Sequence, residues 1–173
     1  MTGKKEFVEE FLERNQEAKS IGDGYLHEGE DIVIKVVEPE RVTEVEENFS
    51  VFSNFWDQTA IYSVWEFDEE VSGYSPENYF VPQERADRVL STSDFNDPEI
   101  RKMLIDTVES FCENRLVLDN WIDNFGVFRY NGDRTVKYLD VQDMQSVRPL
   151  KATGYEDPFE PFTARYLNQP ADC

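Results

Sequence analysis

Cysteine and histidine are nearly absent from this chain of 173 residues. It contains two cysteines, Cys112 and Cys173, and one histidine, His27. Two cysteines cannot form the disulfide framework of a small secreted domain, and together with one histidine they cannot supply the four ligands of a structural Cys/His zinc site. We therefore expect neither class. A bridge between Cys112 and Cys173 stays open as an alternative, but we expect Cys112 to behave as a small buried hydrophobe.

Basic residues are also scarce. The chain has 17 Lys and Arg against 37 Asp and Glu, which gives a formal net charge of -20. Such a surface repels nucleic acid phosphates and anionic lipids, so direct nucleic-acid binding is not expected. Three explanations of the charge stay open: a halophilic source, a DNA mimic that occupies a basic groove, and a plain acidic protein.

Long apolar runs are missing as well. No run approaches the roughly 20 residues that span a bilayer. The first 14 residues are charged and amphipathic, unlike a secretory signal. We therefore expect no membrane association, and a cytoplasmic location in a cell or in an infected host.

Aromatic residues, in contrast, are abundant: 13 Phe, 8 Tyr and 3 Trp. They supply large side chains for a core, so one folded domain is expected at this length. Apolar periodicity predicts helices at 6–18, 39–56 and 98–115, with a short one at 85–90. Apolar runs between turn residues predict strands at 25–26, 31–37, 59–67, 79–81, 125–130 and 135–140.

These elements predict an α+β fold with a small antiparallel sheet and packed helices. The last two strands flank Asn131-Gly132-Asp133, which is typical of a hairpin turn. We expect residues 1–143 to form a single globular domain whose N-terminal helix is 6–18. Residues 144–173 are rich in proline, and we expect an extended C-terminal tail that packs on the domain through Phe159, Phe162 and Tyr166.

The segment 119–140 carries the clearest chemical pattern. Asp119 lies five residues before Asn124, and Asp140 ends the second strand of the hairpin. Phosphoryl transfer needs a carboxylate that orients the attacking hydroxyl and oxygen ligands for Mg²⁺ between the phosphates. One loop and the adjoining hairpin can supply all of these groups. Each residue alone also has a structural explanation: Asp119 as a cap, Asn124 in a turn, and Asp140 in an Asx turn.

In this order the residues resemble the catalytic and metal-binding loops of the protein kinase-like superfamily, including the aminoglycoside phosphotransferase type. The matching pattern is D-x-x-x-x-N-F-G-V, a turn, and a hydrophobic strand that ends in Asp. The resemblance implies that Asp119 is catalytic, that Asn124 and Asp140 bind metal, and that ATP and Mg²⁺ are cofactors. It also implies a kinase-like N-terminal lobe with a truncated C-terminal part, since about 30 residues follow Asp140.

Upstream residues extend the resemblance over roughly residues 20–143. Lys35 lies in an apolar strand, like the family's lysine that contacts the α- and β-phosphates. The alternative is a solvent-facing lysine on an edge strand. The next predicted helix offers Glu44, Glu46 and Glu47 as partners of this lysine. Glu46 is favoured because it lies beside the apolar face of that helix.

Other features depart from the family pattern. Gly22, Gly24 and Gly29 stand in the place of the glycine-rich loop, but no third glycine follows at the family's spacing and several acids crowd the segment. Val117 replaces a customary histidine, and Val141-Gln142 follows Asp140. These departures favour a reduced or inactive kinase-like protein over a complete phosphotransferase. The alternatives are a non-enzymatic acidic protein that binds a basic protein partner (a virus-encoded inhibitor, DNA mimic or virion component), or an acidic protein from a halophile.

Overall fold

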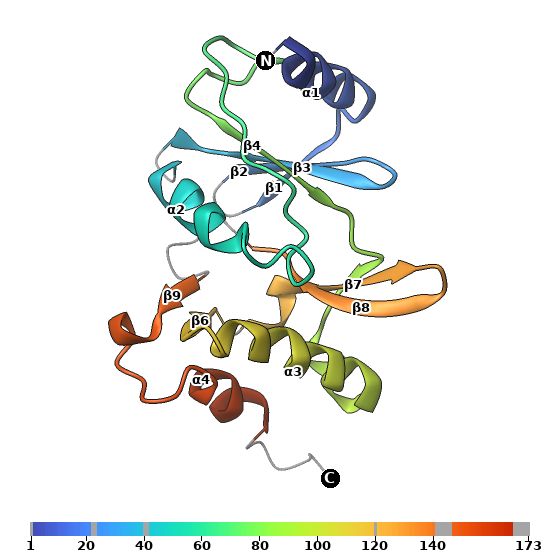
Figure 1. Ribbon diagram of the computed structural model, residues 1–173. Coiled ribbons are helices and arrows are strands. Elements are labelled where there is room, and N and C mark those ends of the chain that lie inside the picture. Colours follow the sequence, from blue (N-terminus) through green and yellow to red (C-terminus); the bar gives the residue numbers. More distant parts are fainter. Residues whose placement is uncertain (1, 22–23, 40–41, 120, 141–146, 168–173) are drawn as a thin grey trace.

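Four antiparallel strands form the largest sheet of the protein (Figure 1). The computed structural model describes residues 2–21, 24–39, 42–119, 121–140 and 147–167. In sheet order, the strands are β1 (Ala18–Ile21), β2 (Gly24–Glu28), β3 (Ile32–Val37) and β4 (Tyr79–Glu84). β3 and β4 are almost entirely buried, as expected for apolar strands with packing on both faces. The predicted α+β class with a small antiparallel sheet is confirmed.

The first helix, α1 (Thr2–Arg14), lies over one face of this sheet, as Figure 1 shows. Val8 and Leu12 are its buried residues, and they lie four positions apart on one side of the helix. They form a cluster with the sheet residues Ile34, Val36 and Phe80. This layer buries the face of β3 opposite to Lys35, because side chains alternate along a strand.

The predicted helix 6–18 is wrong at both ends, because α1 starts at Thr2 and stops at Arg14. Asn15 closes the helix: its backbone N–H and its side-chain amide both donate to the carbonyl of Phe11. Ala18 then pairs with His27 as the first residue of β1. The segment 15–20, which is polar except for Ala18, thus ends the helix and allows an edge strand to form.

The other face of the sheet shares one large core with α2 (Val42–Phe52) and α3 (Pro98–Cys112). Its buried residues include Val37, Val81, Val45, Phe52, Leu104, Phe111 and Tyr138. Asp97 caps α3 by accepting hydrogen bonds from the N–H groups of Glu99 and Ile100, and Pro98 occupies the first turn. Both helices are shorter than the predicted 39–56 and 98–115.

A second sheet contains β5 (Arg88–Val89), β7 (Phe125–Tyr130) and β8 (Asp133–Tyr138), in that order. Asn131 and Gly132 have φ values of 52° and 98°, as a two-residue type I′ turn requires. The hairpin prediction is therefore confirmed. The predicted helix at 85–90 is wrong, because Arg88 and Val89 pair with β7. The predicted strand at 59–67 is reduced to isolated bridges at Thr59, Ile61 and Trp65.

Short elements connect and follow these layers. β6 (Leu116–Leu118) pairs with β9 (Val147–Pro149), so the segment expected to be an extended tail contains a paired strand. The 3₁₀ turns are η2 (Thr92–Asn96), η3 (Ile122–Asn124) and η4 (Leu150–Ala152). The short helix α4 (Glu160–Phe162) leads into one π-helical turn, η5 (Thr163–Leu167). Proline breaks this region into pieces too short for long helices.

The described helices include none with the length and apolar character needed to cross a membrane.

Candidate active site

Lys35 places a charged side chain in the buried middle of β3. The residue is only 9% exposed, and its neighbours across the sheet are Leu26 on β2 and Val81 on β4. Its Nζ donates a 2.9 Å hydrogen bond to the main-chain carbonyl of Leu139. Burial lowers the pKa of the ammonium group, and electrostatic attraction to the Asp140 carboxylate opposes that shift. Lys35 is thus an inner-strand residue rather than an edge-strand lysine.

Leu139 connects Lys35 to the loop that carries Asn124. Its carbonyl accepts the hydrogen bond from Lys35, 104 positions away in sequence. Its N–H donates to the main-chain carbonyl of Asn124 over 2.8 Å. Because Leu139 directly precedes Asp140, this residue brings the strand lysine, the loop asparagine and the Asp at the end of the hairpin together.

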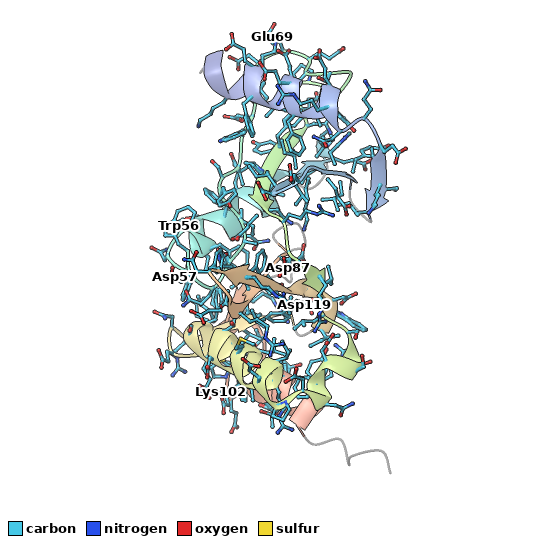
Figure 2. All side chains as sticks on the ribbon, turned by 90° about the vertical axis from the view of Figure 1, so that its right-hand side faces the viewer. Trp56, Asp57, Glu69, Asp87, Lys102 and Asp119 are labelled. Carbon is cyan, nitrogen blue, oxygen red and sulfur yellow. The ribbon has the colours of Figure 1, made fainter. Side chains whose placement is uncertain are left out.

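Asp119 and Asn124 are joined directly by their side chains. Asp119 follows β6, while Asn124 ends the 3₁₀ turn η3. The Nδ2 group of Asn124 donates a 3.1 Å hydrogen bond to Oδ2 of Asp119. The backbone N–H of Asn124 also donates to the carbonyl of Trp121, which closes the turn. Figure 2 labels Asp119, which lies about midway along the long axis of the molecule in that view.

Four of the five predicted site residues therefore form one connected group: Lys35, Asp119, Asn124 and Asp140. It combines a buried cation, two carboxylates and an amide. The elements around this group follow the order that the sequence resemblance implied: a lysine strand, a helix, a second helix, the Asp–Asn loop, a hairpin and a final Asp. The group offers a positive charge for phosphate, oxygen ligands for a hard metal ion and a carboxylate that can accept a proton.

Glu46, the predicted partner of Lys35, is not brought to it. Its carboxylate is on the exposed side of α2 and accepts a 3.1 Å hydrogen bond from Oη of Tyr79. Tyr79 also donates to Glu66, and burial together with these two carboxylates raises the pKa of the Tyr79 phenol. The prediction fails because Glu46 follows the buried Val45, and one residue is a 100° rotation around a helix. Glu47 is exposed too, and the side chain of Glu44 lies outside the described residues.

Asn48 is the polar residue that the sequence analysis missed on α2. It is 5% exposed and lies on the buried face of the helix. The sequence could have predicted this burial, because Asn48 lies three residues after Val45 and four before Phe52, which puts all three on one side of the helix. An inward-facing amide therefore occupies the side of α2 on which a glutamate was predicted.

The glycines of the predicted glycine-rich loop are explained by close backbone packing. A Cβ at Gly24 would lie 2.0 Å from the carbonyl oxygen of Val36 on β3, which precedes Val37, the residue opposite Gly24 across the sheet. A Cβ at Gly29 would lie 2.6 Å from the ring of Phe11 on α1. Gly22 lies outside the described residues. Close packing thus explains why glycine occupies positions 24 and 29, without a role in phosphate binding.

This group offers oxygen donors suited to a magnesium ion, although it does not surround the ion with protein ligands. In the part of the chain that the structure describes, no cluster of three or more His, Cys, Asp or Glu side chains could hold a metal ion. Mg²⁺ commonly takes one or two protein oxygens and completes its shell with water and nucleotide phosphates. The carboxylate of Asp140 and the amide oxygen of Asn124 fit that pattern, because both are hard oxygen donors.

No protein-family model matches the chain, and no curated protein matches it in sequence. Similar solved structures include WbdD in a co-crystal with the kinase inhibitor LY294002, at 14% identity and a TM-score of 0.49. The match covers 78% of this chain and 33% of WbdD. The kinase domain of PknI from Mycobacterium tuberculosis is 13% identical, with a TM-score of 0.45 and coverage of 80% of this chain and 64% of PknI.

WaaP in complex with acyl carrier protein is 11% identical, with a TM-score of 0.43. That match covers 77% of this chain and 64% of WaaP. The chain thus spans from about one third to just under two thirds of the length of these three structures.

Proposed function

We propose that this protein is a kinase-like domain that binds ATP with Mg²⁺ at the Lys35–Asp140 group. The observation that carries the proposal is the series of hydrogen bonds from Lys35 through Leu139 to Asn124 and Asp119. Lys35, the loop with Asp119 and Asn124, and Asp140 follow one another along the chain in the order in which kinases use a lysine, a base with a metal-binding amide, and a metal-binding carboxylate. Lys35 would contact the phosphates, Asn124 and Asp140 would bind the metal ion, and Asp119 would orient the acceptor hydroxyl.

The electrostatics of the group support nucleotide binding. A lysine ammonium in a buried strand has lost most of its hydration and gains little from one neutral carbonyl partner. A phosphate would add negative charge to that of the Asp140 carboxylate, which already attracts this ammonium. When bound, a magnesium ion would neutralise part of the phosphate charge, which matters in a chain of net charge -20.

We further propose that this is a reduced site with slow or no turnover. Kinase catalysis requires an ion pair between the strand lysine and a glutamate of the following helix. Here Glu46 binds Tyr79 instead, and Lys35 binds the carbonyl of Leu139. Asp119 can still orient an acceptor hydroxyl and receive its proton, because Asn124 holds its carboxylate in place.

Thermal unfolding with ATP and MgCl₂ tests the binding proposal, with Lys35→Met as the site variant. We expect the wild type to be stabilised by about 2.7 kcal/mol when ATP is present at 100 times its dissociation constant. Lys35→Met should lose most of that shift relative to its own nucleotide-free form. Lys102→Met is the matched control, because Lys102 is exposed on α3 and labelled in Figure 2. Equal shifts in wild type and Lys35→Met would contradict the proposal.

A second proposal is that the protein binds a basic protein partner without enzymatic activity. The observation that favours it is the charge: 37 acids against 17 Lys and Arg. Affinity purification at 0.05 and 0.5 M salt tests it, because attraction between exposed charges is screened as salt rises. A basic protein that is retained only at the lower salt would support this function, and retention of no basic protein would count against it. A halophilic origin would show instead as loss of the fold at low salt.

A further inference from the structure

The C-terminal turn η5 packs against the loop that carries Asp119 and Asn124. The guanidinium carbon of Arg165 lies 3.7 Å from the centre of the Trp121 ring, which is stacking distance. Tyr166, the next residue, hydrogen-bonds with the backbone of Ile122. Two consecutive residues of η5 therefore hold two consecutive residues of the loop.

The turn itself is firmly attached to the body of the protein. The Tyr166 ring stacks on Phe95, with ring centres 5.0 Å apart and an interplanar angle of 21°. Phe162, one turn earlier, is 3% exposed and packs against both of those rings. These contacts hold η5 against η2, so Arg165 reaches Trp121 from a fixed base.

Trp121 is the largest exposed side chain in the described part of the loop. Between Asp119 and Asn124, Trp121 has a side chain that is 54% exposed, and the 3₁₀ turn η3 is only three residues long. Asn124 is held by its hydrogen bonds to Asp119 and to the carbonyl of Trp121 and by the N–H of Leu139, and Ile122 is buried in the core. The exposed indole of Trp121 would move without a partner, and because the carbonyl of Trp121 accepts the N–H of Asn124, that motion would loosen the turn that carries Asn124.

Charge adds to the case for an arginine at this place. Burial raises the pKa of the Tyr166 phenol, the positive charge of Arg165 opposes that shift, and the negative charges of Asp123 and Asp119 add to it, so the charges of η5 and of the loop act on the same phenol. A guanidinium group can stack flat on an indole and still face carboxylates, whereas a lysine ammonium cannot stack in this way.

We infer that Arg165 is a positioning residue for the proposed site, holding Trp121 so that Asp119 and Asn124 keep the geometry needed for magnesium-bound ATP. The inference depends on the proposed nucleotide-binding function. Groups that orient metal ligands typically matter by 10–100-fold in metal affinity. The part of ATP affinity that depends on magnesium should therefore respond to Arg165, and the magnesium-free part should not.

Isothermal titration with ATP, with and without MgCl₂, tests this on the full chain. We expect Arg165→Ala and Arg165→Lys each to weaken ATP binding about tenfold in MgCl₂ and less than twofold in EDTA. Arg101→Ala is the matched control, since it removes the same charge from an exposed position on α3. If Arg165→Lys binds like the wild type, charge rather than stacking is responsible and the inference is overturned.

Hydrogen exchange of the nucleotide-free proteins gives a second readout. We expect the backbone amides of 121–124 to exchange about tenfold faster in both Arg165 variants than in the wild type and in Arg101→Ala. Unchanged exchange in Arg165→Ala would overturn the positioning role. If the wild type binds no ATP, the proposed function fails, and this comparison alone still decides whether Arg165 holds the loop.

Discussion

At the residue scale, the position of Lys35 in the fold and the identity of its hydrogen-bond partner differ in how far the sequence predicts them. Its apolar neighbours predicted a buried strand, and that prediction is confirmed. Its partner is a main-chain carbonyl, which every residue type provides, so no residue at position 139 could have pointed to it. The position of Lys35 in the fold was therefore predictable, while the interaction that places it beside Asp140 was not.

The stability of the protein should depend on Lys35 at alkaline pH. Burial lowers the pKa of Lys35 in the folded state, so the folded protein gives up this proton at a lower pH than the unfolded chain. The cost of burying the charge is relieved as the pH rises from the lowered pKa towards 10.5. We expect the free energy of unfolding of the wild type to rise relative to Lys35→Met across that window.

Urea unfolding at pH 7 to 10.5 measures this difference. The comparison between the two proteins cancels the opposing effect of Tyr79 and Tyr130, whose raised pKa values destabilise the fold above pH 10 in both. A constant difference between wild type and variant at all pH values would show that Lys35 does not titrate with a lowered pKa.

The helix α2 shows where residue-level prediction failed within the site. Its helical nature was predicted correctly, but the residue chosen as partner of Lys35 was one position away from the buried face. Glu46 and Asn48 differ by 200° around the helix axis, so a small error in phase exchanges an exposed residue for a buried one. Sequence patterns identify a helix more reliably than they identify its inward face when acids and apolar residues alternate closely.

At the element scale, the most predictable unit was the β7–β8 hairpin. Asn-Gly between two apolar runs specifies one turn type, because both residues need positive φ. The strands β1 and β5 were missed for the opposite reason. β1 is mostly exposed and β5 has two residues, so neither has an apolar pattern. β1 exists through pairing with β2, which follows it directly in the chain, and β5 through pairing with the distant strand β7.

Gly132 and Gly3 form a matched pair for testing the hairpin. Neither would place a Cβ within 4 Å of another atom, so substitution by alanine changes backbone energetics alone. Gly132 has φ of 98°, and Gly132→Ala should cost about 1–2 kcal/mol of unfolding free energy. Gly3 lies in α1, where Gly3→Ala should stabilise by about 0.5–1 kcal/mol. Urea unfolding of both variants measures these two changes in the free energy of unfolding, which should have opposite signs. Equal changes in the two variants would contradict the turn conformation at Gly132.

At the scale of the whole molecule, the acidic charge is spread over the surface. Figure 2 labels Glu69, Asp57 and Asp87, which come from separate parts of the chain and are all exposed. Surface ion pairs such as Lys5–Glu69 and Lys19–Glu28 offset some of it, but acids exceed bases by 20. The folded state holds these like charges closer together than the unfolded chain does, so their repulsion destabilises it.

Added salt should therefore stabilise the protein. Raising KCl from 0.05 to 1 M shortens the Debye length from over 10 Å to about 3 Å and screens this repulsion. We expect a gain of about 1–2 kcal/mol, which corresponds to a rise in Tm of roughly 2–8 °C for a chain of this size. The same titration near pH 4.3, where the net charge approaches zero, is the control and should show little effect. A Tm that is independent of KCl at pH 7 would refute the repulsion account.

The hydrogen bond between Lys35 and the carbonyl of Leu139 also determines what a mutational scan of this protein can detect. Substitutions at position 139 would report only the packing of a side chain that is 8% exposed, because the carbonyl stays whatever the residue. Side-chain substitution would thus not disturb the hydrogen bond between the large sheet and the Asp119 loop at its Leu139 end. Only exchange of the peptide bond for an ester, or substitution of Lys35 itself, would reveal how the two halves of the site depend on each other.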